Sequence, residues 1–458
     1  MNTSATIDEI SARATAPTQA LPRLLRGVGE HGALGLQQHL ALHGPLPKVR
    51  GGARKRARAR AASLIDEVER AGLLGHGGAA FPMARKMRAV AQARGRAIVL
   101  VNGVEAEPAS AKDHTLLEML PHLVLDGAIV AAEALDADEA IIAVGGADSA
   151  AARQLELALA ERSYGGQDGG PRLTAASAPR HFVAGQESAL INFLGGGEAK
   201  PTFTPPLPFE RGLRRRPTLV NNVETLAHLA LIARFGAPWF RQLGTASQPG
   251  SALVTISGPV AYPGVYEIEH GASLVSLIDA AGGLTGGARG ALLGGYSGGW
   301  VGGERVRQLA LSNEQLGPHR ATLGAGVVLL LSEQACPVAE VARLARWLAG
   351  QSARQCGPCV FGLDALAGAV EGIAAGSAPP RVGRRIEELV SLTERRGACS
   401  HPDGATRVIL SGLHAFQSDF AQHQRHGPCE RCAQSAELPL PHIPVAAPRS
   451  SSFLRLTR

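Results

Sequence analysis

Long apolar runs and aromatic side chains are both scarce in this sequence. Of 458 residues only 4% are aromatic, with three tryptophans and four tyrosines. No stretch reaches the roughly 18 uninterrupted apolar residues that a membrane-spanning helix needs. The N-terminal MNTSATIDEISARA lacks the basic segment and apolar core of a secretory signal peptide. We therefore expect a cytoplasmic protein.

Cysteine is also scarce, with six residues in the whole chain. Disulfides are rare in cytoplasmic proteins, so we expect these thiols to be metal ligands or redox groups rather than structural cross-links. Glycine (56) and proline (29) are abundant by contrast. That combination is typical of a globular chain with many turns and close backbone contacts.

The positive net charge of +7 is concentrated near the N-terminus. The segment KVRGGARKRARARAAS, residues 48–63, has seven lysines and arginines and no acid. Such a run is able to touch nucleic acid or an anionic membrane. It has no interleaved aromatics on which bases would stack, so we expect no specific nucleic-acid binding. The simpler interpretation is that residues 1–60 form a basic, flexible extension.

Residues 61–245 show the alternation of an α/β domain. Short apolar runs at 97–103, 139–145 and 180–185 predict three buried strands, and amphipathic or apolar segments between them predict helices. The apolar segment that contains Pro121 reads as helical, with the proline at a start or a kink. Alternating strands and helices predict a parallel sheet with ligand sites at the carboxyl ends of its strands.

The texture of the sequence changes after about residue 245. Residues 246–335 contain short β-rich runs, a Pro-Gly turn and one helix-like stretch, which indicates a small separate β+α domain. Residues 336–425 contain four amphipathic segments, which predict a helical bundle. Residues 426–458 are rich in proline and serine, and we expect an extended tail that carries a Cys-x2-Cys pair.

Residues 72–82, GLLGHGGAAFP, are the first candidate site. Glycines ahead of a helix let backbone N–H groups approach an anion, although a turn without a ligand is the simpler alternative. Polar residues that follow the predicted strands, and Lys86 one turn into the next helix, strengthen the case for a phosphate-bearing ligand. They are Asn102, Glu105, Glu107, Gln186, Glu187, Ser188, Asn221 and Asn222. Asn221-Asn222 could also simply cap a helix.

Four segments together resemble one known family. GLLGHGGAAFPMARKM, VNGVEAEPASAKDH, GQESAL and RPTLVNNVETL are similar to the FMN- and NADH-binding 51 kDa (F) subunit of respiratory complex I and to related diaphorase subunits. Order and spacing agree from about residue 60 to 420. The resemblance implies a Rossmann-like FMN domain, a β-grasp domain of the soluble-ligand-binding type, and a helical bundle that holds an iron–sulfur cluster.

The resemblance also implies roles for individual residues. Glu107 and Glu187 are the candidate catalytic groups on the nicotinamide side, and Lys86 would reach the FMN phosphate. The candidate cofactor-binding residues are Gly75, His76, Gly77, Gly78, Phe81, Lys86, Asn102, Glu105, Gly185, Asn221 and Asn222.

The chain departs from the family at several of these positions. His76 stands where arginine is usual, Val104 where an acid is usual, and Gln186 replaces the first residue of a Glu pair. Near the expected adenine site, phenylalanines are replaced by Ala89 and Leu207, and a lysine is replaced by Thr204. Losing two stacking faces costs roughly 1–3 kcal/mol of binding. The pattern therefore favours FMN binding and leaves NAD(H) binding open.

The cysteines also depart from the family pattern, which is Cys-x2-Cys-x2-Cys followed by a distant fourth cysteine. Ala353 occupies the first position, and Cys356, Cys359 and Cys399 remain. Three thiolates suit a [3Fe–4S] centre, or a [4Fe–4S] centre with an outside ligand. We expect Cys429, or its neighbour Cys432, to supply the fourth ligand.

Other assignments of the thiols stay open. His401 and His426 are weaker substitutes for the fourth ligand. The two Cys-x2-Cys pairs could instead form a zinc site, or no metal is bound at all. Cys336 is read as a small core residue.

These features point to a flavoprotein of the NADH dehydrogenase (diaphorase) type. It would pass electrons from NADH through FMN to an iron–sulfur relay, a ferredoxin or a quinone-linked partner. The alternative is an electron-transfer or assembly subunit that has lost NADH oxidation and exchanges electrons with a ferredoxin-like partner. Either protein would be cytoplasmic, with peripheral association on the inner face of the membrane as an option.

Overall fold

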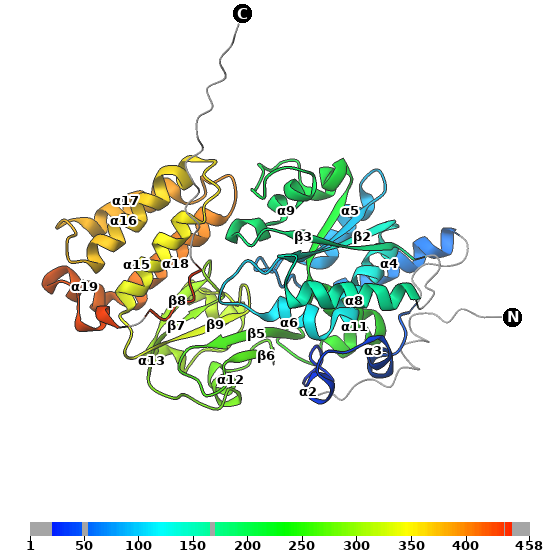
Figure 1. Ribbon diagram of the computed structural model, residues 1–458, viewed down its shortest axis with the longest axis horizontal. Coiled ribbons are helices and arrows are strands. Elements are labelled where there is room, and N and C mark those ends of the chain that lie inside the picture. Colours follow the sequence, from blue (N-terminus) through cyan, green and yellow to red (C-terminus); the bar gives the residue numbers. More distant parts are fainter. Residues whose placement is uncertain (1–20, 48–53, 165–169, 435, 442–458) are drawn as a thin grey trace, which may run out of the picture.

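The computed structural model describes residues 21–47, 54–164, 170–434 and 436–441. In Figure 1 an α/β part lies on the right and a group of C-terminal helices on the left, with a second sheet below and between them. Among the described residues no single helix is long and apolar enough to cross a membrane. The helices α6 (Lys112–Met119) and α7 (Pro121–Ala134) reach that length and composition only as a pair bent by 95°.

The first sheet is parallel and has the strand order β3-β2-β1-β4. Its strands are β1 (Ile98–Gly103), β2 (Glu139–Gly145), β3 (Arg172–Ala178) and β4 (Thr218–Asn222). β1 and β2 confirm the strands predicted from the apolar runs at 97–103 and 139–145. The prediction of a strand at 180–185 is wrong, because Phe182–Gly185 forms a 3₁₀ helix after β3 has ended. β3 has few buried side chains at this sheet edge, so it lacks an apolar run.

Helices cover both faces of this sheet. Val99 and Val101 of β1 face one apolar core, and the alternate residues Ile98 and Leu100 face the other. The helices of this part are α4 (Arg54–Ala71), α5 (Met83–Gln92), α6 (Lys112–Met119), α7 (Pro121–Ala134), α8 (Ala150–Tyr164), α9 (Glu187–Leu194), α10 (Pro208–Arg211) and α11 (Val223–Phe240). Pro121 is the first residue of α7, a position where its missing N–H costs nothing.

The expected flexible extension over residues 1–60 is wrong for residues 21–47. They contain α2 (Val28–His31) and α3 (Leu36–His43), and Leu24 is fully buried in the first core. On α3, His39 binds the buried carboxylate of Asp126 at 2.6 Å. The basic residues from 54 onward belong to α4, while 1–20 and 48–53 lie outside the described residues.

The second sheet is mixed, with the order β6-β5-β9-β7-β8. β5 and β9 are parallel and the other pairs antiparallel. The elements are β5 (Ser251–Ser257), β6 (Gly264–Glu269), α12 (Leu274–Ala280), β7 (Ala288–Leu293), β8 (Gly299–Gly302), α13 (Gly303–Val306), α14 (Asn313–Leu316) and β9 (Val327–Ser332). The residues of α12 pack into the core formed by these strands. This is the β-grasp-like domain that the sequence predicts.

The C-terminal part consists of helices, as expected. They are α15 (Pro337–Gly350), α16 (Leu363–Ala374), α17 (Val382–Thr393), α18 (His401–Ala415) and α19 (Gln417–His426). The fourth predicted helix is in fact two, because the chain turns at Phe416.

The segment after α19 is not a free tail over its described residues. Glu437 accepts a hydrogen bond from the Ser332 backbone at 2.9 Å, and Glu340 of α15 accepts one from Leu438 N at 3.2 Å. Leu438 is buried in the C-terminal core. Residues 436–441 therefore pack back onto the junction between β9 and α15.

Candidate functional site

The carboxyl edge of the parallel sheet gathers the predicted asparagines. Asn102, the next-to-last residue of β1, lies opposite Asn222 of β4, and Asn221 lies opposite Val101. In a sheet of order 3-2-1-4 the connections reverse direction between β1 and β4, and ligands bind in the crevice at that point. The asparagine side chains therefore lie at the carboxyl ends of β1 and β4, where this topology forms a ligand-binding crevice.

The side chains of Asn221 and Asn222 make different contacts. The Asn222 side chain caps α11 by accepting from Glu224 N at 3.0 Å, and its amide donates to Asp113 at 2.6 Å. Asn221 is buried, and its Nδ2 has no hydrogen-bond partner among the described residues. A buried amide without a partner is costly. An acceptor-rich ligand at this edge would remove that cost.

The glycine-rich loop between α4 and α5 lies over the same edge. A Cβ added at Gly77 would approach the Asn222 Cβ to 3.4 Å, and one at Gly75 would lie 3.4 Å from Phe81 O. Gly78 has φ +106° and faces open space, a backbone conformation that side-chain-bearing residues rarely adopt. The loop and the unpartnered Asn221 amide together fit FMN.

Lys86 and Glu187, predicted for different roles, meet in the structure. Lys86 Nζ lies 3.1 Å from Glu187 Oε2 and donates to Val220 O at 3.1 Å. Both side chains are partly exposed. Lys86 is therefore held against the middle of β4 beside Glu187, where its ammonium would be a counter-charge for a phosphate.

Gly185 joins this edge through the backbone. Asn102 Nδ2 donates to Gly185 O at 2.8 Å, and a Cβ at Gly185 would come within 3.0 Å of Val104 O. Phe81 is 46% exposed, so its ring is available at the surface beside the glycine loop. Phe203, which the sequence reading did not single out, is 67% exposed and precedes the Thr204 and Leu207 departures.

Two predicted acids are engaged by the protein itself. Glu105 accepts from Ser110 Oγ at 2.6 Å and from the backbone N of Asp113 and of His114, each at 3.0 Å. It thereby anchors the start of α6. The Glu107 carboxylate accepts from Tyr296 N of the second sheet at 2.8 Å, and burial raises its pKa to about 8.

His76 belongs to a buried charged cluster that the sequence reading missed. Its Nδ1 lies 2.9 Å from Glu224 Oε1, and Lys112 Nζ lies 2.9 Å from Glu224 Oε2. The rings of His228 and His270 lie near His76, with centroids 4.9 and 5.7 Å from that of His76 and both rings tilted to it. Although burial alone would raise the pKa of Glu224, His76 and Lys112 hold it well below its usual range. The signal for this cluster in the sequence was His76, which stands where the family usually has arginine.

Cys356, Cys359 and Cys399 form one group at the start of α16 and of α18. Burial raises the pKa of the Cys359 thiol to about 12, with a further contribution from Cys356 and Cys399. Burial also raises the pKa of Cys399, an effect that the Gln186 side-chain amide opposes by donating to the sulfur. Three thiols close enough to raise one another's pKa fit an iron–sulfur cluster.

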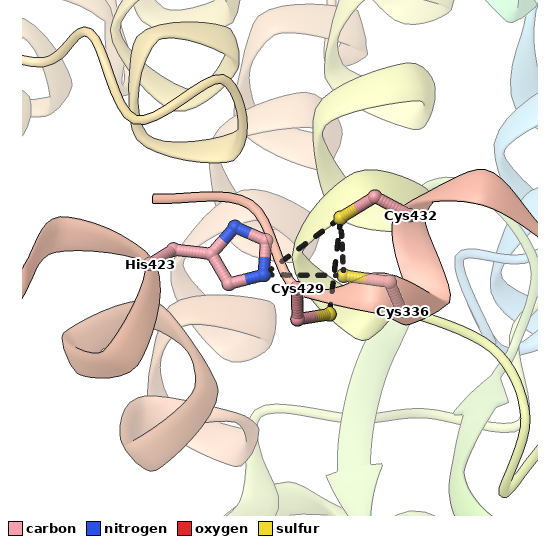
Figure 2. A group of neighbouring side chains, drawn as sticks. All are labelled: Cys336, His423, Cys429 and Cys432. Atoms are coloured by element: carbon pink, nitrogen blue, oxygen red, sulfur yellow. Dashed lines mark hydrogen bonds between the residues drawn. The ribbon is translucent and has the colours of Figure 1, made fainter. Parts of the chain in front are cut away.

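The structure does not group Cys429, the predicted fourth ligand, with these three thiols. Cys429 lies with Cys336, His423 and Cys432 in a separate group (Figure 2). We therefore assign Cys429 to that group rather than to Cys356, Cys359 and Cys399. Of the substitutes, His401 is buried, with Nε2 at 2.9 Å from Leu348 O and no partner at Nδ1 among the described residues.

Comparison with known proteins matches all three parts. Residues 68–231 match the Nuo51 FMN-binding domain, 253–299 the SLBB domain, and 339–423 the NADH-ubiquinone oxidoreductase-F iron-sulfur binding region. The chain is 31% identical over 370 residues to the F subunit of NADH-quinone oxidoreductase of Streptomyces coelicolor, covering 79% of this chain and 82% of that protein. The chain belongs to the family of NADH-quinone oxidoreductase F subunits.

Further relatives agree with this family. The F subunit of the Escherichia coli NADH-quinone oxidoreductase is 30% identical over 370 residues, covering 78% of this chain and 83% of the relative. A chain of the air-oxidized NAD⁺-reducing [NiFe]-hydrogenase superposes with a TM-score of 0.77 at 29% identity, over 88% of this chain and 67% of that one. The predicted family, fold class and cofactor class are thereby confirmed.

The family match also divides the cysteines. Cys356, Cys359 and Cys399 lie within the matched iron–sulfur region, 339–423. Cys336 lies ahead of it, and Cys429 and Cys432 lie beyond it. The two groups thus differ in position within the family as well as in space.

Proposed function

We propose that the protein oxidises NADH with FMN and passes the electrons to the iron–sulfur centre held by Cys356, Cys359 and Cys399. The observation that carries this proposal is the continuity between the two sites. Asn102 at the flavin edge binds Gly185 O, and the next residue, Gln186, contacts Cys399. FMN accepts a hydride and releases single electrons, and a short path between the sites is what such a relay needs.

Residues of this chain would hold the flavin from three sides. The glycine loop Gly75, Gly77 and Gly78 leaves room for it, and Asn221 offers an unpartnered amide. Lys86 would neutralise the phosphate. Glu187 is already ion-paired with Lys86, so its side chain would be displaced when phosphate binds to Lys86.

Fewer observations support the proposed NADH-binding site than the FMN site. Phe81 and Phe203 are exposed aromatics of the α/β part, and we propose Phe81 as a stacking face for adenine. Glu107 and Glu187 remain the proposed nicotinamide-side groups. Burial of the Glu107 carboxyl outweighs its hydrogen bond from Tyr296 N and favours the protonated form, which can donate to a substrate or cofactor oxygen.

The electron acceptor is proposed from the relatives and from charge. The relatives are named as subunits of a quinone oxidoreductase and of a hydrogenase. We propose a ferredoxin-like or other iron–sulfur subunit as partner, in the cytoplasm or at the inner face of the membrane. The net charge of +7 suits an acidic partner.

Anaerobic purification followed by absorbance spectra before and after NADH addition tests this proposal, with flavin and iron quantified alongside. Bleaching of the flavin by NADH, with about three or four irons per chain, is the expected result. Bound flavin that ignores NADH but is reduced by a ferredoxin would contradict NADH oxidation. A colourless protein would contradict the redox function altogether.

Substitution of Lys86 by methionine should weaken FMN binding about 10- to 100-fold, since a charge-assisted hydrogen bond contributes about 1.5–3 kcal/mol. Flavin fluorescence titration of the deflavinated protein measures this. Arg85→Met, at an exposed neighbouring position of α5, is the matched control. Equal FMN affinities of the two variants would rule out Lys86 as the phosphate ligand.

A further inference from the structure

A second group of potential metal ligands lies outside the family's iron–sulfur motif. Three thiols and one imidazole, from Cys336, His423, Cys429 and Cys432, have their ligand atoms within 4.8 Å of one another. Figure 2 shows the three sulfurs and the imidazole turned toward a common centre. The residues come from separate places in the chain: Cys336 caps the start of α15, and His423 lies on α19. Cys429 precedes a short 3₁₀ turn, Glu430–Ala433, that contains Cys432.

The spacing of these atoms is that of a single tetrahedral metal ion. With Zn–S bonds of about 2.3 Å and Zn–N bonds of about 2.0 Å, tetrahedral geometry separates two sulfurs by about 3.8 Å and a sulfur from a nitrogen by about 3.5 Å. The Sγ atoms of Cys429 and Cys432 are 3.8 Å apart, and those of Cys432 and Cys336 are 3.4 Å apart. His423 Nε2 lies 3.4 Å from Cys336 Sγ and 3.9 Å from Cys432 Sγ.

An iron–sulfur cubane suits this spacing less well. Its protein ligands bind different irons of one cluster, so they must stand farther apart than ligands that share one ion. A disulfide between Cys429 and Cys432 is also not formed, because all six cysteines are free. The set contains no open position, which is the mark of a structural rather than a catalytic zinc site.

The surroundings of the imidazole favour metal binding. His423 Nδ1 lies 3.2 Å from Ala374 O. A carbonyl only accepts, so the proton sits on Nδ1 and the lone pair of Nε2 points at the sulfurs. This arrangement, in which the second ring nitrogen is held by a carbonyl, is typical of metal-bound histidine. Cys336 is 3% and His423 1% exposed, so both present their ligand atoms in the interior.

We propose that Cys336, His423, Cys429 and Cys432 bind one structural zinc ion. The ion would tie the segment that follows α19 to the start of α15. Residues 436–441 continue from this point along the junction of the second sheet and the helices, where Tyr296 donates to Pro439 O at 3.1 Å and Trp347 to Pro441 O at 3.0 Å. The site therefore fixes the start of residues 429–441, whose described residues from 436 onward contact the β-grasp domain.

Metal analysis of the full-length protein tests the proposal, with zinc, iron and acid-labile sulfide measured on the same anaerobic sample. We expect about one zinc per chain, which Cys432→Ser reduces to below about a tenth while iron and sulfide stay unchanged. Cys356→Ser is the matched control at the other thiol group. It should lower iron and leave zinc in place.

Two further variants keep the test valid if a ligand substitution also affects folding. His423→Cys preserves a four-ligand set and should retain zinc, whereas His423→Ala should lose it. Substitution of cobalt for zinc should produce the strong visible bands of tetrahedral cobalt–thiolate, and these should vanish in Cys432→Ser. Absence of zinc from wild-type protein produced with added zinc would overturn the proposal. Loss of iron when Cys429 and Cys432 are both replaced by serine would overturn it too.

Discussion

At the scale of single residues, environment decides what each charged group can do. Glu105 and Glu107 are two positions apart, yet His114 and neighbouring donors hold the pKa of Glu105 below its usual value in spite of burial, while burial raises that of Glu107 to about 8. Among the described residues, Glu107 accepts hydrogen bonds from two backbone N–H groups, those of Tyr296 and Ala109, and forms no ion pair. The effect of burial on its pKa therefore prevails. No local pattern in VNGVEAEP distinguishes the two acids.

Glu107→Gln should make stability less dependent on pH. Because the folded pKa is about 8 against an ordinary value of 4.5, the folded state keeps a proton that the unfolded chain has lost, so wild-type stability falls as pH rises through this window. The free energy of unfolding, measured by denaturant titration between pH 5 and 8, should fall more steeply for wild type than for the variant. Parallel curves would show that Glu107 ionises normally.

At the scale of elements, a buried ion cluster holds the N-terminal helices to the α/β part. Asp126 of α7 accepts from His39 of α3, from Arg162 of α8 at 2.5 Å and from Arg234 of α11. Its pKa is held far below the usual range, because these partners outweigh the effect of burial. One side chain thus connects four helices, and the packing of α3 depends on it.

Asp126→Asn should lower the free energy of unfolding by about 3–5 kcal/mol, since it leaves two buried arginines without their carboxylate. Urea or guanidinium titration at neutral pH measures this loss. Asp148→Asn, at an exposed position beyond β2, provides the control and should change stability by less than about 0.5 kcal/mol. A loss no larger than that of the control would mean that the cluster contributes no net stability.

At the scale of the whole molecule, the three parts meet around the carboxyl edge of the parallel sheet. The β-grasp domain contributes Gly295 and Tyr296 against Glu107, and the C-terminal helices contribute Gln351, which accepts from Phe182 N at 3.1 Å. A Cβ at Gly295 would approach Glu107 Oε2 to 2.5 Å. The glycine is needed here for close contact between domains as well as for its φ of +88°.

Gly295→Ala should therefore destabilise the protein more than Gly283→Ala. Both glycines have positive φ, but Gly283 has open space where a Cβ would be placed. Strain alone costs about 1 kcal/mol, and the clash at Gly295 adds about 1–3 kcal/mol. Denaturant titration of both variants, repeated in a Glu107→Ala background, should show the excess disappear when the carboxylate is removed. An unchanged excess would place the clash elsewhere.

Local sequence was sufficient for the parts of the molecule that have a local signature. The strands at 98–103 and 139–145, the glycine loop and the amphipathic helices follow from residue periodicity and turn chemistry, which act over a few residues. The sequence did not predict β3 and β4, because neither is a long apolar run. Their pairing depends on strands that are far away in the sequence. The packing of residues 21–47 depends on distant partners in the same way.

Which cysteines meet depends on tertiary packing. Spacing suggested that Cys429 joins Cys356, Cys359 and Cys399, yet its sulfur lies beside Cys432, which in turn contacts Cys336 across a sequence separation of 96 residues. This ligand set is brought together by the packing of α15, α19 and residues 429–432, and no local sequence motif encodes that packing. The flavin edge combines both kinds of information: its residues are readable in the sequence, and only the β1–β4 junction places them around one crevice.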